Sequence, residues 1–478
     1  MSWPFGRRKP RRASSAPHDP QGHRLLGLTP DTNQPIWAPK GHSLLLSANG
    51  GGKSTCGAMP WLFSFAASEP HKAVLGLDSK NGEMAAQAAN MLARMGRKVA
   101  IIDDMGALPD DCPHKVSLNP FSSTVTISQQ QPEDLIYAVD NIKNALIPEP
   151  AEPDERNRYF REWPRNLVEF SLLVLLKRSS ALAIPGGIWA LLSDPRKLRK
   201  FAAIESEEGD QALMSLATNI MEMAEHEHWP QHLEAAQRAL RLFTAGARLH
   251  NAGAGAMTTH AKLIEEGTII FLVGPQAYIN KLGPYYALHI MCFIDALYGG
   301  AGSLRIIADE FTNAPLKSLV ESLTTLRAFG CEVHMIAQSR SEIERKFGRL
   351  ETQTIEENSI TKQWFGFSSF DEAERISKAI GEEQAVTSTL GADTESLRLQ
   401  TNLQLIKQRW LSPAELMAMG PNDQLIHVKN LGFFLAKKIG QQNIAPYCHE
   451  IAANPLEGGK LPPDPKITLT TPDKGATS

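Results

Sequence analysis

Short apolar runs alternate with amphipathic segments along the chain after its first 35 residues. The runs Ser43–Leu46, Ala73–Asp78 and Lys98–Asp103 have the length of buried strands, and the segments 55–65 and 82–96 between them have helical spacing. Strands that are apolar on both faces and are separated by helices are typical of a parallel sheet covered on both sides. The pattern therefore predicts an α/β fold.

This alternation is interrupted in the middle of the chain. Between about residues 128 and 258 the strand signals disappear, and four segments have the spacing of amphipathic helices: DLIYAVDNIKNAL, RNLVEFSLLVLLKR, DQALMSLATNIMEMAEH and LEAAQRALRLF. The strand pattern then returns at Thr268–Pro275, Leu304–Glu310, Cys331–Ser339 and 423–430. We therefore expect a mainly parallel sheet with an all-helical subdomain inserted into it.

The overall composition is that of a soluble globular protein. Of 478 residues, 42% are apolar and 21% are charged, and the net charge of −3 does not by itself indicate a nucleic-acid binder. The five cysteines lie far apart without metal-ligand spacing, which predicts a reducing compartment and no structural zinc site. No window reaches the ~18 consecutive apolar residues that a membrane span needs. The basic N-terminus has no apolar stretch behind it, so we expect no secretory signal.

The stretch LLLSANGGGKSTCGAMPWLFSF, from Leu44 to Phe65, contains three successive glycines directly before a lysine. Successive glycines let backbone N–H groups turn toward an anion, and a helix that begins there adds its positive N-terminal end. In the phosphate-binding pattern G-x-x-x-x-G-K-[ST], the lysine contacts the outer phosphates and the next hydroxyl binds Mg²⁺. The residues that we assign to this nucleotide site are Gly50, Gly51, Gly52, Lys53, Ser54 and Thr55.

One position departs from this pattern. Ser47 stands where the first glycine is expected, which could alter the geometry of the phosphate loop. The alternative interpretation is a flexible turn that happens to carry a lysine. An apolar strand before the loop and a helix after it favour the nucleotide site.

A second group of polar residues follows two later strands. Phosphoryl transfer needs a metal ion, a group that orients the attacking water and a cation for the developing charge. Asp309 and Glu310 end an apolar strand, so we expect Asp309 to hold Mg²⁺ and Glu310 to polarise the water; a solvated turn is the alternative. Gln338 ends the next strand, where an amide can sense the γ-phosphate. Arg327 precedes that strand and is either an arginine finger for a neighbouring subunit or a helix-surface arginine.

These assignments divide the chain into five parts. Both ends are rich in proline and polar residues, which predicts disordered tails. The expected parts are a basic tail at 1–35, the first half of a nucleotide-binding domain at 36–127, an all-helical insertion at 128–258, the second half of the nucleotide-binding domain at 259–452 and a second tail at 453–478.

Several motifs occur together in the order found in one known family. They are SANGGGKST, VLGLDSKNGEM, SLNPF, RIIADEFTNAPLKSLVESLTTLRAFGCEVHMIAQSRSEIERKFG, FDEAERISKAIG and KQRWLSPAELMAM. Over about residues 40–450 the chain therefore resembles the type IV secretion coupling proteins, which are the TraG/TraD-type ATPases of conjugation. The stretch from about 300 to 381 is the most specific part of this resemblance.

The resemblance implies a RecA-like P-loop NTPase that assembles as a homo-hexamer and hydrolyses ATP with Mg²⁺ at subunit interfaces. It implies a motor that moves DNA, single-stranded in this family, or relaxase-type protein cargo into a type IV secretion channel. Position by position, the residues that match the family are Lys53 with Ser54 or Thr55 in the P-loop, Asp309 and Glu310 as the metal-binding and catalytic acids, Gln338 as the sensing glutamine, Arg327 as the interfacial arginine, and Lys80 and Glu83 in the D-P-K-G-E motif. That last motif is altered by Ser79 and by an inserted Asn81, which leaves the functions of Lys80 and Glu83 open.

Two further departures concern location and cargo. The membrane anchor usual in the family is not found, so we expect a cytoplasmic protein that is peripheral at the bacterial inner membrane, through a partner or through its basic tail. The C-terminal tail is not strongly acidic, so docking rules based on acidic tails do not transfer. The alternative functions are an FtsK/HerA-type translocase of duplex DNA and a non-catalytic adaptor that recruits cargo through the helical subdomain.

Overall fold

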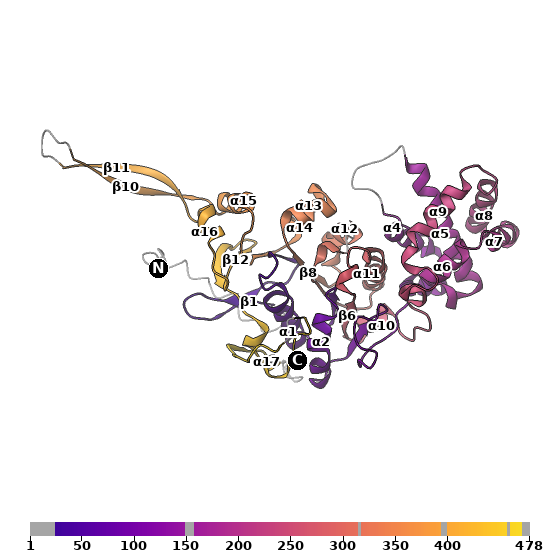
Figure 1. Cartoon of the computed structure of the whole chain (residues 1–478), viewed down its shortest axis with the longest axis horizontal. Helices are drawn as coiled ribbons and strands as arrows, with labels where there is room; N and C mark the ends of the chain where they lie inside the picture. The colour runs from indigo at the N-terminus through magenta and orange to yellow at the C-terminus, as the bar shows by residue number, and fades with distance from the viewer. Residues whose placement is uncertain (1–23, 149–156, 314–316, 393–398, 457–458, 471–478) are drawn as a thin grey trace.

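The computed structural model describes residues 24–148, 157–313, 317–392, 399–456 and 459–470. Its centre is an 11-stranded sheet (Figure 1). Six strands carry the apolar runs of the sequence: β3 (Ser43–Leu46), β4 (Ala73–Asp78), β5 (Val99–Ile102), β6 (Ile269–Val273), β7 (Leu304–Ala308) and β8 (Cys331–Ala337). A seventh, β9 (Thr361–Trp364), has the more polar sequence TKQW. The seven strands lie in the order β9-β3-β8-β7-β4-β6-β5 and all run parallel. The predicted α/β fold with a mainly parallel sheet is confirmed.

Four antiparallel strands extend this sheet beyond β9. They are β1 (Arg24–Leu28), β2 (Pro35–Ala38), β12 (Asp423–Val428) and β13 (Gly432–Lys437), in the order β2-β1-β13-β12. β12 pairs with β9, and Leu28 of β1 pairs with Lys437 of β13. The predicted tail at 1–35 is therefore wrong from residue 24 onward, because β1 is completely buried against a strand from the far end of the chain. Residues 1–23, with the basic cluster, lie outside the described residues.

The predicted C-terminal tail at 453–478 also needs correction. Strand β15 (Ile467–Thr468) pairs in parallel with β14 (Ile444–Ala445), beside helix α17 (Tyr447–Glu450). Asn454 is buried and donates from Nδ2 to Glu83 Oε1 at 2.7 Å. These contacts join residues far apart in the sequence, so a polar, proline-rich composition did not reveal them. Residues 471–478 lie outside the described part of the chain.

Helices cover the parallel sheet and form a separate block. Those in contact with the sheet domain are α1 (Met59–Ser68), α2 (Glu83–Arg94), α10 (His260–Glu265), α11 (Gly283–Tyr298), α12 (Lys317–Leu326), α13 (Arg340–Phe347), α14 (Arg349–Asn358), α15 (Phe370–Ile380) and α16 (Pro413–Met417). Between β5 and β6 the chain forms α3 (Ser122–Gln130), α4 (Leu135–Leu146), α5 (Arg158–Arg178), α6 (Pro185–Leu192), α7 (Pro195–Glu208), α8 (Gln211–Met223) and α9 (Trp229–Ala239). Most of this inserted block extends to one side of the sheet (Figure 1). No helix in the described ranges is long and apolar enough to cross a membrane.

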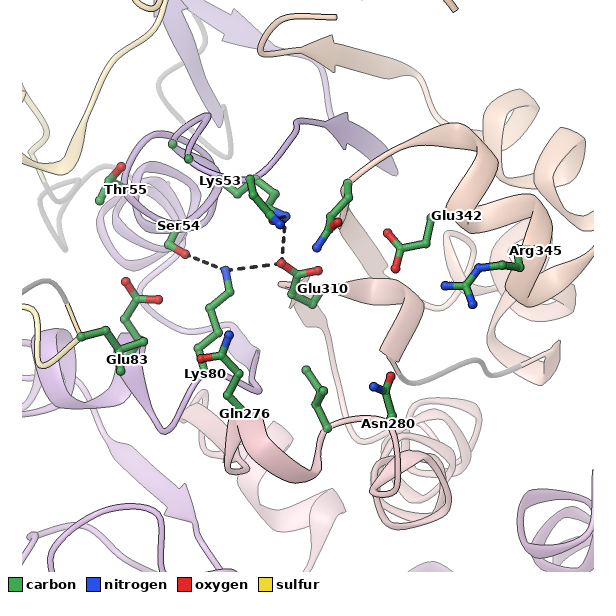
Figure 2. A pocket seen from close by; sticks show the side chains of 16 residues that line it. Lys53, Ser54, Thr55, Lys80, Glu83, Gln276, Asn280, Glu310, Glu342 and Arg345 are labelled. Carbon is green, nitrogen blue, oxygen red and sulfur yellow. Dashed lines mark hydrogen bonds and ion pairs between the residues drawn. The ribbon is translucent and has the colours of Figure 1, made fainter. Parts of the chain in front are cut away.

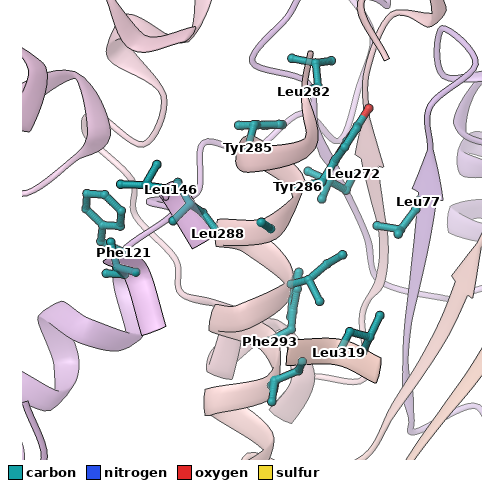
Figure 3. Packing of buried hydrophobic residues seen from close by; sticks show 14 of the residues in the cluster. Leu77, Phe121, Leu146, Leu272, Leu282, Tyr285, Tyr286, Leu288, Phe293 and Leu319 are labelled. Atoms are coloured by element: carbon teal, nitrogen blue, oxygen red, sulfur yellow. The ribbon is translucent and has the colours of Figure 1, made fainter. Parts of the chain in front are cut away.

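Helix α11 connects the helical block to the sheet. In the buried cluster of Figure 3 it lies between Leu77 and Leu272, which come from β4 and β6, and Phe121 and Leu146, which come from the helical block. All four side chains are at most 4% exposed. The inserted helices therefore share one hydrophobic core with the sheet domain.

A long hairpin was not anticipated from the sequence. Strands β10 (Glu382–Ala392) and β11 (Leu399–Arg409) pair antiparallel along their full length and project from the body of the molecule (Figure 1). Arg409, at the base of the hairpin, donates from Nη2 to Glu374 Oε1 of α15 at 2.9 Å. This contact attaches the hairpin to the sheet domain.

Candidate nucleotide site

The glycine-rich segment forms a tight loop between β3 and the helical turn η1 (Lys53–Ala58), which continues into α1. Gly50 and Gly52 have φ angles of 75° and 89°, a left-handed conformation that favours glycine. The Ser47 hydroxyl lies beneath Gly51, where an added Cβ would come within 2.2 Å of its oxygen. Ser47 thus fits under the loop as long as residue 51 is glycine.

The two acids after β7 lie opposite this loop. β8 separates β3 from β7, so the carboxyl ends of the three parallel strands meet at one edge of the sheet. Lys53 Nζ lies 2.8 Å from Glu310 Oε1 (Figure 2), and Ser54 Oγ donates to Asp309 Oδ2 at 3.2 Å. Lys53, Asp309 and Glu310 are at most 8% exposed. The structure therefore brings together two motifs that lie more than 250 residues apart, at separations of 257 and 255 positions.

Lys80, in the loop between β4 and α2, lies at the centre of the same site. Its Nζ is 2.9 Å from Asp309 Oδ2, 3.1 Å from Ser54 Oγ and 3.6 Å from Glu310 Oε1. Figure 2 shows Lys53 and Lys80 approaching Glu310 from two sides. Burial disfavours the charged amine, but attraction by Asp309, Glu310 and Glu83 outweighs this effect and raises the pKa of Lys80.

Other acids surround the two lysines. Asp78, at the end of β4, is buried beside Asp309 and Glu83, and burial followed by these charges raises its pKa to about 8. Its Oδ2 still accepts a hydrogen bond from the backbone N–H of Ala85 at 2.8 Å. Burial also raises the pKa of Glu83. Carboxylates thus gather at one edge of the sheet, where oxygen ligands suit a hard divalent cation.

The pocket at this edge has a volume of about 620 Å³. Small-molecule sites span about 300–1,000 Å³, so a mononucleotide fits. Of the predicted site residues, those that line it are Gly50, Gly52, Lys53, Ser54, Thr55, Glu310 and Gln338. Sequence reasoning assigned no function to seven further lining residues. Asn49, Glu342 and Arg345 lie inside the quoted motifs but were not singled out, and Gln276, Ile279, Asn280 and Leu456 come from segments without a recognised motif.

Two predicted residues need a closer description. The Thr55 hydroxyl lies 3.8 Å from Cys56 Sγ, whereas Ser54 contacts Asp309, so the geometry favours Ser54 as the hydroxyl of the metal site. Arg327 is exposed in the turn before β8, whereas the pocket follows the carboxyl ends of the strands. A single chain therefore does not bring Arg327 into its own pocket.

The donor set fits Mg²⁺ held with a nucleotide. Asp309 Oδ1 is buried without a hydrogen-bond partner among the described residues. Asp309 Oδ2 and Ser54 Oγ are 3.2 Å apart, close to the ~3 Å between neighbouring oxygens around an octahedral Mg²⁺. In the described ranges no three His, Cys, Asp or Glu side chains form a metal site by themselves. Mg²⁺ usually takes one or two carboxylates and completes its shell with phosphate and water.

The phosphate loop is also held from the antiparallel side of the sheet. Lys438, just after β13, donates to the carbonyl oxygens of Gly51 at 3.1 Å, Phe365 at 3.1 Å and Pro421 at 3.0 Å. One ammonium group thus uses its three donors on three separate loops. Lys438 therefore fixes the backbone of the phosphate loop.

Replacing Lys438 with methionine is expected to lower the free energy of unfolding by about 1–3 kcal/mol, because it removes the donor from partly buried carbonyls. Nucleotide binding should weaken as the loop loosens. Urea denaturation and titration with a fluorescent ATP analogue measure the two effects. Lys437→Met is the matched control, since the contact recorded for the Lys437 side chain is exposed, to Asn33 Oδ1 at 3.3 Å. Equal effects of the two substitutions would contradict the assignment.

A known protein family matches the part of the chain that carries the second group of site residues. The family described as the TraM recognition site of TraD and TraG matches residues 303–421, which include Asp309, Glu310 and Gln338. The predicted resemblance to the type IV secretion coupling proteins is confirmed. No protein of curated function matches the chain in sequence.

Solved structures of the coupling protein TrwB and of VirB4 share the fold. The unbound bacterial conjugative coupling protein TrwBdeltaN70 is 15% identical, with a TM-score of 0.62 over 83% of this chain and 84% of the solved chain. TrwB bound to the ATP analogue ADPNP is 17% identical, with a TM-score of 0.60 over 83% and 85%. VirB4 of Thermoanaerobacter pseudethanolicus is 13% identical, with a TM-score of 0.52 over 90% and 98%. The RecA-like P-loop fold of the coupling proteins is thereby confirmed for this chain.

Proposed function

We propose that this chain is an ATP-hydrolysing motor that delivers DNA or protein–DNA cargo into a type IV secretion channel. The observation that carries the proposal is the convergence of Lys53, Ser54, Asp309 and Glu310 at one pocket. The TraM recognition-site match and the TrwB-like fold support the coupling function.

In the proposed reaction each side chain has one task. The backbone of Gly50–Gly52 and the Lys53 ammonium hold the phosphates. Ser54 and Asp309 would hold Mg²⁺, which would supply positive charge to the phosphate oxygens. When Lys53 turns toward phosphate it releases Glu310, whose carboxylate then orients the attacking water and accepts its proton. Gln338, at the end of β8, senses the γ-phosphate.

The proposed assembly is a homo-hexamer in which Arg327 of each subunit reaches the pocket of its neighbour. The position of Arg327 away from its own pocket supports this arrangement. The proposed partners are single-stranded DNA, relaxase-type cargo and components of the secretion channel. Membrane contact would come through such a partner or through the basic N-terminal residues. A DNA-gripping channel should make binding strongly salt-dependent and largely independent of sequence.

The test is Mg²⁺-dependent ATP hydrolysis by the purified chain, with and without single-stranded DNA. We expect turnover that DNA stimulates and that is lost in Lys53→Ala. Absence of turnover at every DNA and salt concentration, with nucleotide binding intact, would favour the non-catalytic adaptor instead. Stimulation by duplex DNA alone would favour a translocase of the FtsK/HerA type.

The Lys53→Ala variant should also bind nucleotide about 10- to 100-fold more weakly. The reason is that a hydrogen bond to a charged group contributes about 1.5–3 kcal/mol. Equilibrium titration with a fluorescent ATP analogue measures this loss, and Lys437→Ala provides a control for the removal of one positive charge. Unchanged affinity in Lys53→Ala would place the phosphates elsewhere.

A further inference from the structure

The contacts of Lys80 coincide with those expected of the metal ion. Its Nζ bonds to Ser54 Oγ at 3.1 Å and to Asp309 Oδ2 at 2.9 Å, and these are the two oxygens assigned to Mg²⁺ above. Glu310 Oε1 is 3.6 Å from the same ammonium. A lysine ammonium and a divalent cation repel each other strongly at such separations, so they cannot share both oxygens.

The backbone holds Lys80 in this position. Asn81 and Gly82 have φ angles of 57° and 73°, so two consecutive left-handed residues turn the chain sharply after Lys80 and before α2. Asn81 Oδ1 accepts from the backbone N–H of Gln276 at 3.0 Å, and the N–H of Asn81 donates to Gly274 O at 3.1 Å. The residue inserted into the D-P-K-G-E motif therefore anchors the loop that carries Lys80. The Lys80 side chain is 16% exposed and lines the pocket that would take the phosphates.

We infer that Lys80 is a built-in counter-cation that occupies the magnesium position until metal and nucleotide arrive together. Its ammonium balances Asp309 and Glu310 and keeps Ser54 and Asp309 in place. Binding of the metal–nucleotide complex displaces the ammonium toward the phosphates, where its charge is again compensated. Metal without nucleotide binds poorly, because no phosphate is then present to compensate the charge of the displaced Lys80 ammonium. This inference rests on the proposed function and adds to it a reason for joint binding of metal and nucleotide.

The inference is tested by metal binding to the nucleotide-free full chain. Mn²⁺ serves as the probe, and its dissociation constant is measured by electron paramagnetic resonance. We expect Lys80→Met to bind Mn²⁺ at least tenfold more tightly than the unmodified protein. Adding Asp309→Asn to Lys80→Met should abolish this gain, because it removes a carboxylate from the site. Lys80→Gln provides a second neutral variant should Lys80→Met fail to fold.

Lys53→Met is the matched control. It also removes one positive charge from the pocket, but Lys53 contacts Glu310 and Asn49 rather than the two metal oxygens. Direct competition predicts a clearly larger gain in Mn²⁺ affinity for Lys80→Met than for Lys53→Met. Equal gains, or no gain in either neutral Lys80 variant, would overturn the inference.

The test of Lys80 can fail or succeed independently of the test of ATP hydrolysis. The Mn²⁺ measurement needs neither hydrolysis nor DNA, so a chain without turnover still reports on Lys80. Repeating it with a non-hydrolysable ATP analogue should tighten Mn²⁺ binding strongly in the unmodified protein and much less in Lys80→Met. Equal tightening in both proteins would overturn the displacement step.

Discussion

Replacing Glu310 with glutamine is expected to lower ATP turnover by about 10²- to 10⁴-fold, the usual contribution of a positioned general base. The amide keeps the size of the side chain and can still accept a hydrogen bond from Lys53, but it cannot take a proton from water. Glu310 has a φ angle of 58°, an unusual backbone conformation for a residue with a side chain, and it is 8% exposed. Strained backbone of this kind is often retained at functional sites.

Binding of an ATP analogue to the same Glu310→Gln sample is the control, and it should change by no more than a few-fold. Steady-state phosphate release measures the turnover. A variant that binds nucleotide normally and also hydrolyses it normally would show that another group orients the water. Loss of both binding and turnover would instead indicate that Glu310 supports the phosphate loop through Lys53.

The parallel part of the sheet could be predicted from the sequence because each of its strands can be recognised from a few neighbouring residues. Strands β3, β4 and β7 are short apolar runs, and the glycine loop, Asp309 and Glu310 directly follow such runs. Parallel strands place their carboxyl ends at one edge, so residues that follow them can be expected to meet. The convergence of Lys53 with Glu310 agrees with this rule, while the catalytic function of Glu310 stays a prediction.

The position of the Lys80 side chain could not be predicted from its neighbours in the sequence. Lys80 matches the lysine of the D-P-K-G-E motif, but because of the inserted Asn81 the sequence did not predict where the Lys80 side chain points. Whether Lys80 faces the pocket depends on the left-handed turn at Asn81 and Gly82 and on the contact of Asn81 with Gln276. That contact joins residues 195 positions apart, which no pattern around Lys80 reveals.

The antiparallel edge was missed for a related reason. β1 follows a proline- and arginine-rich segment, so composition assigned it to a tail. Its burial depends on β13 and on ionic contacts with residues more than 40 positions away, namely Glu69 and Glu332. A buried arginine such as Arg24 also does not look like a core residue in a sequence.

Those ionic contacts form a buried cluster at the end of the sheet opposite the nucleotide site. Arg305 donates from Nε to Glu69 Oε2 at 2.7 Å and from Nη2 to Glu69 Oε1 at 2.9 Å. Lys72 Nζ lies 2.8 Å from Glu69 Oε1, and Arg24 pairs with both Glu332 and Glu69. Glu69 therefore joins α1 to β7 and to β1, and it balances the buried positive charges of Arg305 and Arg24.

Replacing Glu69 with alanine is expected to lower the free energy of unfolding by about 3–5 kcal/mol, because it leaves the buried cations Arg24 and Arg305 with Glu332 as the one carboxylate recorded beside them. Urea denaturation measures the change. The control is Glu450→Ala, since the pair between Arg94 and Glu450 is 61% and 53% exposed and such pairs contribute about 0–1 kcal/mol. Similar losses in both variants would contradict the importance of the buried cluster.

The stability contribution of Glu69 should also depend on pH. Burial alone would raise the pKa of Glu69, but the hydrogen bonds and charge of Arg305, with Arg24 and Lys72, hold it at about 2, below its ordinary 4.5. Because the folded pKa is the lower one, ionised Glu69 stabilises the protein fully above pH 4.5, and this contribution is lost as the pH falls toward 2. The difference in unfolding free energy between the unmodified protein and Glu69→Gln should therefore be constant near neutral pH and shrink below pH 4.5. A difference that stays constant throughout acidification would show that Glu69 is not the ionised partner of Arg305.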